Sequence, residues 1–282
     1  MRLYERLKNL ERSRRFLDGD PIPYYFRVIR TKLFRKILIK RQFLSHSIAS
    51  VNIETFCFCN RKCYFCFFHE RFPKREQGIM AETTYKKIID DLAKIKYCGR
   101  VSPHNFGEPL LDNRLPTLME YTKQKLPNCF IYIATNGDFL TDDLFRELID
   151  KGVDHFYITN YDDEEKDFLK VLSEECHVHV TLRDYKFIKK YDRAGKIYNL
   201  NLPFHGPCLR PSSQLVINWK GDVTLCCNDF YGNFVMGNVN DNNLLDIWTN
   251  SNFTYYRNKL NKGQRSDISI CRHCDMEGCI PW

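Results

Sequence analysis

The sequence lacks several features that define large protein classes. No apolar run approaches the length needed to cross a bilayer, which argues against a transmembrane protein. No signal peptide opens the chain, and it contains no repeat of solenoid period and no low-complexity segment. We therefore expect a cytoplasmic protein, and 282 residues with 43% hydrophobic content suffice for one large α/β domain plus a smaller appendage.

Cysteine, in contrast, is abundant. The chain has 13 cysteines, an odd number in a long chain, whereas disulfide-stabilised secreted domains are short. Most of these cysteines fall in clusters, which favours reduced thiols that bind metal. Cys98, Cys129 and Cys176 have no close partner in the sequence, and we expect them to be core residues.

Positive charge exceeds negative charge, with 43 Lys and Arg against 35 Asp and Glu and a formal net charge of +8. The excess is concentrated in residues 27–41, where basic and apolar side chains are interleaved. A helix of this kind could lie on an anionic membrane or bind an acidic partner. The simpler interpretation is a cap with a solvated basic face, and we expect no nucleic acid as a partner.

Strand-like and helix-like stretches alternate after residue 48, which indicates an α/β fold. The predicted strands are residues 51–56, 100–106, 130–135, 155–159, 177–182 and 197–202, and the predicted helices are residues 82–97, 112–125, 142–151 and 163–175. About six βα units in succession imply a parallel sheet with right-handed crossovers, and so a partial (β/α)6 TIM-like barrel. We assign residues 49–203 to this barrel and residues 1–48 to a basic helical extension.

The pattern changes after residue 203. Residues 215–218 and 223–226 flank a polar turn and are predicted to form a β-hairpin. A helix over about residues 244–260 follows, and the chain then ends in a cysteine-rich segment. We therefore expect residues 204–282 to form a small C-terminal domain of a hairpin plus a helix.

Cys59, Cys63 and Cys66 form a C-x3-C-x2-C run directly after the first predicted strand. Three thiolates on one short loop can bind three irons of a [4Fe-4S] cluster, which leaves the fourth iron open for a ligand that is not protein. A structural zinc site would need four ligands, and Cys57 could supply the fourth. Motifs further along the chain favour the cluster.

The spacing of this run, with Phe65 before its last cysteine, resembles the signature of the radical S-adenosylmethionine (SAM) superfamily. The resemblance implies that the amine and carboxylate of SAM bind the open iron. It also implies that an electron from the cluster cleaves SAM to a 5′-deoxyadenosyl radical. Gly107, Glu108 and Pro109 resemble the family's glycine-glutamate-proline motif, although Phe106 replaces the first glycine of the usual pair.

The same resemblance implies further cofactor contacts at the ends of the later strands. Asn136 lies in a Thr-Asn-Gly triplet that the family often carries beside the cofactor. Thr159 ends the fourth predicted strand and Arg183 follows the fifth. The resemblance implies that they contact the ribose or the carboxylate of SAM. In α/β barrels, ligand chemistry gathers at the C-terminal ends of the strands.

A second set of cysteines surrounds the hairpin and the end of the chain. Four thiolates from this set would fill every iron of a second [4Fe-4S] cluster: Cys208, Cys226, Cys271 and Cys274. The segment resembles the one-cluster form of the SPASM/twitch extension of radical SAM enzymes. A zinc ribbon is the alternative. Cys227 and Cys279 could each replace a neighbouring ligand, or remain a thiol that donates a hydrogen atom to a substrate radical.

The spacing of the second set also resembles that of twitch-type dehydrogenases, which oxidise a cyclitol alcohol. This resemblance implies an oxidoreductase that acts on a hydroxylated small molecule, with the second cluster as electron acceptor and a flavodoxin- or ferredoxin-like protein as donor. We nominate Arg193 to orient the substrate hydroxyl, with Asp192 and His205 as comparable candidates. The alternatives are a sugar or cyclitol epimerase, a peptide-modifying maturase, and a non-catalytic Fe-S or zinc protein that binds nucleic acid.

Overall fold

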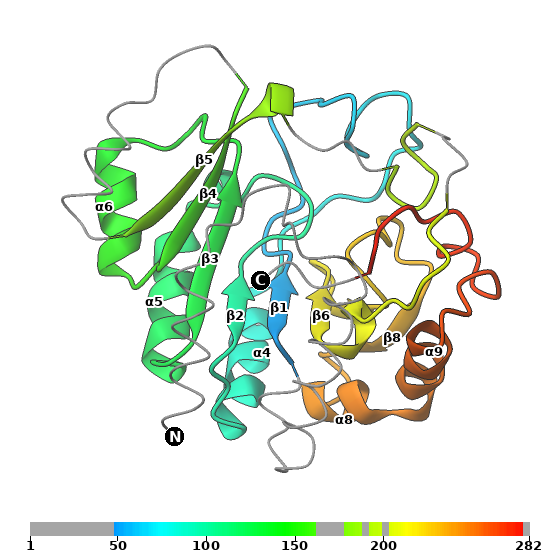
Figure 1. Cartoon of the computed structure of the whole chain (residues 1–282). Helices are drawn as coiled ribbons and strands as arrows, with labels where there is room; N and C mark the ends of the chain where they lie inside the picture. Colours follow the sequence, from blue (N-terminus) through cyan, green and yellow to red (C-terminus); the bar gives the residue numbers. More distant parts are fainter. Residues whose placement is uncertain (1–47, 162–177, 188–191, 199–202, 279–282) are drawn as a thin grey trace.

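The computed structural model describes residues 48–161, 178–187, 192–198 and 203–278. Its strands form one eight-stranded sheet in the order β5-β4-β3-β2-β1-β6-β7-β8 (Figure 1). Strands β1 to β6 pair with one another in parallel, whereas β7 is antiparallel to β6 and to β8. The strands are β1 (Ser50–Ile53), β2 (Arg100–Ser102), β3 (Phe130–Thr135), β4 (His155–Asn160), β5 (His179–Asp184), β6 (Gln214–Ile217), β7 (Asp222–Thr224) and β8 (Val235–Asn238).

Helices alternate with these strands, which confirms the predicted α/β fold. Helices α4, α5 and α6 follow β1, β2 and β3 and lie along one face of the sheet (Figure 1). The α-helices are α4 (Glu82–Lys94), α5 (Leu115–Lys125), α6 (Asp142–Asp150), α8 (Leu244–Thr249) and α9 (Ser251–Asn261), and the 3₁₀ helices are η1 (Pro109–Leu111), η2 (Tyr185–Phe187) and η3 (Arg210–Ser212). Across the described ranges, no helix has the length and apolar character that a bilayer crossing requires.

The two faces of the sheet differ in chemistry because side chains alternate along each strand. The helix-facing side is apolar and joins the main core with side chains such as Val51, Val101 and Ile131. The opposite, inner face carries polar side chains from the intervening positions, including Ser50, Arg100, Ser102, Tyr132, His155, Tyr157, Thr159, Arg183 and Gln214. The helices therefore cover the apolar face and leave the polar face for another use.

The sixth parallel strand comes from an unexpected part of the chain. Residues 197–202 were the predicted strand, but the described Ile197 and Tyr198 form a bend, and residues 199–202 lie outside the described ranges. The strand beside β1 is instead β6, whose residues pair in register with β1 from Ser50 to Ile53. The predicted hairpin is confirmed as β6 and β7, and it continues the main sheet.

The predicted helix over residues 244–260 is two helices. Asn250 breaks it, because its backbone is extended (φ −64°, ψ 162°) and its side chain accepts a hydrogen bond from the Phe253 amide at 2.7 Å. Asparagine is a favoured N-cap residue, so a new helix, α9, begins after it, and Asn250 alone separates α9 from α8. The predicted basic extension of residues 1–48 lies outside the described residues except for Ile48, as do the helix over residues 163–175, Cys176 and Cys279.

A histidine pair on the inner face gives a pH-dependent stability. The Nε2 atom of His155 lies 3.0 Å from His179 Nδ1 and 3.0 Å from Thr181 Oγ1. Burial, with smaller contributions from His179 and Arg100, lowers the pKa of His155 to about 3. In the unfolded chain this pKa is about 6.5, so the unfolded state binds a proton below pH 6.5 that the native state does not.

We therefore expect the protein to lose stability as the pH falls below 6.5. Replacing His155 with Asn should remove about 1 kcal/mol of the loss between pH 7 and pH 5.5. Urea unfolding of both proteins at the two pH values measures the difference. Equal losses in the native protein and His155→Asn would contradict this assignment.

Candidate active site and metal centres

The first cysteine set lies on the loop that follows β1. The amide of Cys66 donates to the carbonyl of Cys63 at 2.9 Å, and the Arg61 amide donates to Cys59 Sγ at 3.4 Å. Burial, with smaller contributions from the nearby Glu108, Cys66 and Cys63, raises the pKa of Cys59 to about 11. The three thiols are therefore close enough to affect one another, and a bound metal would favour their thiolate forms.

Cys57, the candidate fourth zinc ligand, lies apart from this set. Its side chain is fully buried, and its thiol hydrogen-bonds to Glu54. Burial, with a smaller contribution from Glu54, raises its pKa to about 12. The loop thus presents three half-buried thiols and turns the fourth into the core, as a cluster with one open iron requires.

Phe65, Tyr161 and Tyr185 form a group of aromatic rings beside the cysteine loop, which we call the aromatic wall. The ring of Phe65 stacks with Tyr161 at 6.4 Å and with Tyr185 at 6.5 Å. The Tyr161 hydroxyl hydrogen-bonds to Cys63, and the Arg61 guanidinium lies 4.6 Å from the centre of the Tyr161 ring. Sequence reasoning missed both tyrosines, although each directly follows the end of a parallel strand, where ligand-binding residues gather.

Glu108 joins the cysteine loop to the end of β3. Its buried carboxylate accepts hydrogen bonds from the Thr135 hydroxyl at 2.6 Å, the Asn136 amide at 2.8 Å and the Leu110 amide at 3.0 Å. Its own amide donates to the carbonyl of Phe58 at 2.8 Å. The carboxylate of the predicted glycine-glutamate-proline motif is therefore held by three protein donors.

Polar contacts extend this junction to the next turn. Asn136 donates from Nδ2 to Asn60 Oδ1 at 2.9 Å, and Asn60 donates to Asp138 at 2.6 Å. Arg61 forms two further hydrogen bonds to Asp138, each 2.6 Å long. The network fixes the loop against the C-terminal end of β3, which places Asn136 beside the first cysteine set.

Gly107 allows the close approach of the two segments. Its φ is +87°, and an added Cβ would lie 2.4 Å from the Phe56 carbonyl oxygen and 2.9 Å from that of Phe58. Only glycine adopts this conformation without a steric cost, and backbone oxygens cannot move aside as a flexible side chain does. Pro109 follows in η1, where its fixed φ suits the first turn.

Substitution of Gly107 tests this packing. We expect Gly107→Ala to lower the free energy of unfolding by about 3 kcal/mol, because conformational strain and overlap with backbone act together. Gly232 is a matched control, since its φ is +67° but the atom nearest to an added Cβ is 3.9 Å away. Gly232→Ala should cost only about 1 kcal/mol. Equal costs, measured by urea unfolding, would show that the close approach is unimportant.

Thr159 and Arg183 are opposite each other on β4 and β5. Both belong to the polar inner face, and Arg183 donates from Nη1 to the Tyr157 hydroxyl at 2.8 Å. Their strands end beside Tyr161 and Tyr185, the tyrosines that stack on Phe65. The structure thus brings these two predicted contacts to the end of the sheet where the cysteine loop lies.

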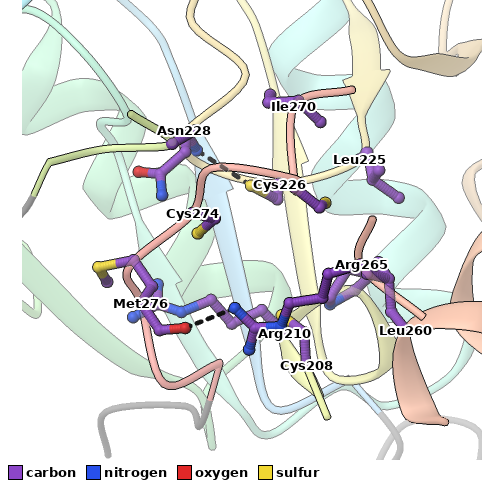
Figure 2. A pocket seen from close by; sticks show the side chains of 13 residues that line it. Cys208, Arg210, Leu225, Cys226, Asn228, Leu260, Arg265, Ile270, Cys274 and Met276 are labelled. Atoms are coloured by element: carbon purple, nitrogen blue, oxygen red, sulfur yellow. Dashed lines mark hydrogen bonds between the residues drawn. The ribbon is translucent and has the colours of Figure 1, made fainter. Parts of the chain in front are cut away.

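The second cysteine set lines one small cavity between the hairpin, α9 and the C-terminal segment (Figure 2). The four predicted ligands Cys208, Cys226, Cys271 and Cys274 all line it. The Cys274 amide donates to the Cys271 carbonyl at 3.1 Å, and the Asn228 amide donates to Cys226 Sγ at 3.2 Å. In the described ranges, no group of three or more Cys, His, Asp or Glu side chains suits a single metal ion. Four thiolates that line one cavity can fill every iron of a [4Fe-4S] cluster.

Cys227 does not line this cavity. Its sulfur accepts a hydrogen bond from Arg210 Nη1 at 3.3 Å. A hydrogen bond with Cys226 and the charges of Arg210 and Arg193 lower the pKa of Cys227. Among the cysteines expected in the core, Cys129 is buried, whereas Cys98 is half-buried.

Arg193 lies in a tight turn near the second set. Its φ of +40° is unusual for a residue other than glycine, and its side chain is half-buried within electrostatic range of Cys227. The neighbouring Asp192 is buried and accepts a hydrogen bond from the Tyr198 amide at 2.6 Å. His205 is exposed. Of the three candidates for the substrate hydroxyl, Arg193 is the one that acts electrostatically on Cys227, next to the second set.

Two family models match the chain. The radical SAM superfamily matches residues 53–196, and the iron-sulfur cluster-binding domain SPASM matches residues 208–275. The first cysteine set falls within the first match, and the four cavity-lining cysteines fall within the second.

Known proteins are similar over most of this length. The S-adenosyl-L-methionine-dependent 2-deoxy-scyllo-inosamine dehydrogenase of Niallia circulans is 30% identical over 230 residues, which are 80% of this chain and 92% of the relative. The crystal structure of BtrN in complex with AdoMet and 2-DOIA matches with a TM-score of 0.73 and 29% identity, over 81% of this chain and 93% of that chain. The structure of anSMEcpe with bound AdoMet shares the fold, with a TM-score of 0.56 and 13% identity over 80% of this chain and 84% of that chain.

Proposed function

The chain belongs to the radical SAM superfamily, and we propose that it is a dehydrogenase that oxidises an alcohol of a sugar or cyclitol. The enzyme is an oxidoreductase with a SAM-binding [4Fe-4S] cluster, SAM and an auxiliary iron-sulfur cluster as cofactors. The observation that supports the proposal most is the convergence of four cysteines on one cavity. In a dehydrogenase, a second cluster would accept the electron that oxidation of the alcohol releases.

The residues that would hold the first cluster are Cys59, Cys63 and Cys66. When bound, the first cluster and SAM supply a 5′-deoxyadenosyl radical, and the second cluster accepts an electron. Phe65, Tyr161 and the backbone around Gly107 would enclose SAM, and Asn136 would contact it from the end of β3. Together with bound SAM, Phe65 and Tyr161 would shield a reactive species from water and so from side reactions.

Residues of the inner face would bind the rest of SAM and the substrate. Thr159 and Arg183 offer a hydroxyl and a guanidinium beside the aromatic wall, which suits a ribose or a carboxylate. Arg193 would orient the reacting hydroxyl by donating hydrogen bonds to its oxygen. Because arginine keeps its charge, it would stabilise negative charge on that oxygen rather than accept the proton.

The four residues that would hold the second cluster are Cys208, Cys226, Cys271 and Cys274. Arg210 lines the same cavity and would offset part of the negative charge of four thiolates. A flavodoxin- or ferredoxin-like protein would supply the electron for SAM cleavage. Contact of residues 27–41 with a membrane surface remains a prediction.

Iron content tests the assignment of the second set. We expect about eight irons per chain in the reconstituted protein and about four in Cys226→Ala, because loss of one thiolate removes one cluster. Cys227→Ala is the matched control, since its sulfur lies outside the cavity, and it should keep about eight irons. Iron and sulfide analysis after anaerobic reconstitution provides the count. A loss of four irons in Cys227→Ala but not in Cys226→Ala would reverse the assignment.

The same pair of variants addresses epimerisation as a second candidate function. Cys227 is a thiol that lies outside the cluster cavity and is held by Arg210, as a hydrogen-atom donor would need to be. A dehydrogenase needs no such donor. If Cys227→Ala keeps both clusters and still forms ketone, the dehydrogenase is supported; if it abolishes an inversion of configuration, the epimerase is supported.

Product analysis tests the function directly. Anaerobic, iron-loaded protein is incubated with SAM, a strong reductant and a panel of sugars and cyclitols, and 5′-deoxyadenosine and ketone are quantified together. We expect both to form in equal amounts with the correct substrate. We also expect Cys59→Ala to form neither, because the first cluster is lost. SAM that remains intact in the native protein under these conditions would refute the proposed chemistry.

A further inference from the structure

Oxidation of an alcohol releases a proton as well as an electron, and the residues assigned above leave that proton without an acceptor. Arginine keeps its charge, so Arg193 does not take the proton. A general base must be unprotonated, within reach of the hydroxyl and free to bind the proton. The inner face and the ends of its strands carry several side chains that can bind a proton, and they differ in these respects.

Most of these side chains are held by the protein itself. Glu54 pairs with Arg75, and Glu108 accepts three hydrogen bonds from residues around it. The Nε2 atom of His155 lies 3.0 Å from His179 Nδ1. Their proton-binding atoms already contact neighbouring groups, which makes them poor acceptors for a proton from a substrate.

His104 is the exception. Its Nδ1 atom is buried, and the structure gives neither ring nitrogen a hydrogen-bond partner among the described residues. Buried polar groups of native proteins are nearly always hydrogen-bonded. An imidazole with two free nitrogens therefore indicates a partner that the protein does not supply, either a ligand or water.

The backbone places His104 on the inner face, just beyond the C-terminal end of β2. Arg100, Ser102 and His104 occupy alternate positions, and side chains alternate between faces along an extended chain. The His104 ring lies 6.2 Å from the ring of Tyr132, and the Arg100 guanidinium lies 4.8 Å from the same ring. The imidazole therefore belongs to the polar face, at the end of the sheet where ligand-binding residues gather.

The segment that carries His104 continues directly to the first cysteine set. Gly107 follows three residues later and packs against the carbonyls of Phe56 and Phe58, at the start of the cysteine loop. Three residues of fully extended chain span at most about 11 Å. A sugar-sized substrate beside the backbone of Gly107 can therefore also contact His104.

The inner face around His104 keeps accessible surface. Tyr132, Tyr157 and His104 itself are half-buried, whereas Ile131 and Ile133, which face the helices, are 0% exposed. Close packing on both faces of the sheet would leave no such surface. A small molecule can therefore reach the imidazole from the inner face.

His104 is uncharged at neutral pH. Burial, with a smaller contribution from the positive charge of Arg100, lowers its pKa to about 4. One nitrogen of a neutral imidazole has a free lone pair, which can accept a hydrogen bond from a hydroxyl. A base of low pKa suffices here, because a ketone that still carries the hydroxyl proton is a far stronger acid than an imidazolium.

We infer that His104 accepts the proton of the substrate hydroxyl that is oxidised. This inference rests on the proposed function and assigns the step that it left open. A hydrogen atom leaves the carbon to form 5′-deoxyadenosine, the hydroxyl proton passes to an imidazole nitrogen of His104, and the remaining electron passes to the second cluster. The C–O bond thereby becomes the C=O bond of the ketone, and His104 later releases the proton to water.

Replacing His104 tests proton transfer separately from hydrogen abstraction. Iron-loaded protein is incubated with SAM, a strong reductant and one of three carbon-deuterated probes: 2-deoxy-scyllo-inosamine, myo-inositol or glucose. We expect His104→Ala to lower the rate of ketone formation by about 100-fold or more. In the same variant, 5′-deoxyadenosine that carries deuterium from the probe should continue to form. Added imidazole should restore ketone formation, because it supplies the missing base.

Two further variants separate this role from a structural one. His104→Gln keeps a polar side chain that is not a base, so it should show the same loss of ketone, and it serves if His104→Ala fails to load iron. His179→Ala is the matched control, because His179 is exposed at the N-terminal end of β5, whereas His104 lies at the C-terminal end of β2. This control should form ketone at the native rate.

Diethyl pyrocarbonate gives a readout that needs no turnover, since it modifies unprotonated imidazole nitrogens that solvent can reach. Mass spectrometry of the iron-loaded protein with SAM should find the modification at His104. At least one of the three probes should protect His104, whereas the exposed His179 should react equally with and without the probe.

Three results would overturn the inference. The first is ketone formation at the native rate in both His104→Ala and His104→Gln, which would assign the proton to water or to another group. The second is an equal loss of ketone and 5′-deoxyadenosine in both variants without rescue by imidazole, which would make the role structural. The third is a His104 that no probe protects. Failure of the proposed function is seen separately, as native protein that cleaves SAM but forms no ketone with any probe.

Discussion

The parallel pairing of β6 with β1 is the constraint on which both cysteine sets depend. β1 leads directly into the loop of Cys59, Cys63 and Cys66, and β6 leads through β7 to Cys226. The pairing runs over all four residues of each strand, and Ala49 and Glu54 extend it with hydrogen bonds at both ends. The first set and Cys226 of the second set are therefore attached to strands of one sheet. Their separation follows from the sheet itself rather than from a linker between two domains.

The two faces of the sheet have different roles, because one is buried in the apolar core and the other carries the polar side chains of the site. Its helix-facing side is apolar and buried beneath α4, α5 and α6, so most of the favourable burial free energy arises there. The inner face is then free to carry histidines, tyrosines and arginines that would weaken an ordinary core. Glu108 and Gly107 link the two functions, because one ties the cysteine loop to β3 by hydrogen bonds and the other allows the backbones to touch.

Much of this arrangement could be predicted from the sequence, because its signals are local. The cysteine spacings, the hairpin turn and the alternation of helix and strand depend on neighbouring residues, and β3 was predicted at its observed bounds. Long-range pairing left no such signal. Nothing in Gln214–Ile217 indicates that this strand joins β1 rather than a separate domain, and the strand predicted over residues 197–202 stood in its place. The break at Asn250 was missed because apolar residues continue across it, although the asparagine was a recognisable cap.

The sequence also could not show which charged side chains pair in the interior, since charge pairing depends on tertiary contacts. In the sequence, Arg61, Arg75 and Arg100 look alike, yet the fold pairs the first two with carboxylates, whereas the Nε of Arg100 is buried with no hydrogen-bond partner among the described residues. A buried guanidinium without a counter-ion lowers stability, and substitution by an apolar residue would remove that cost.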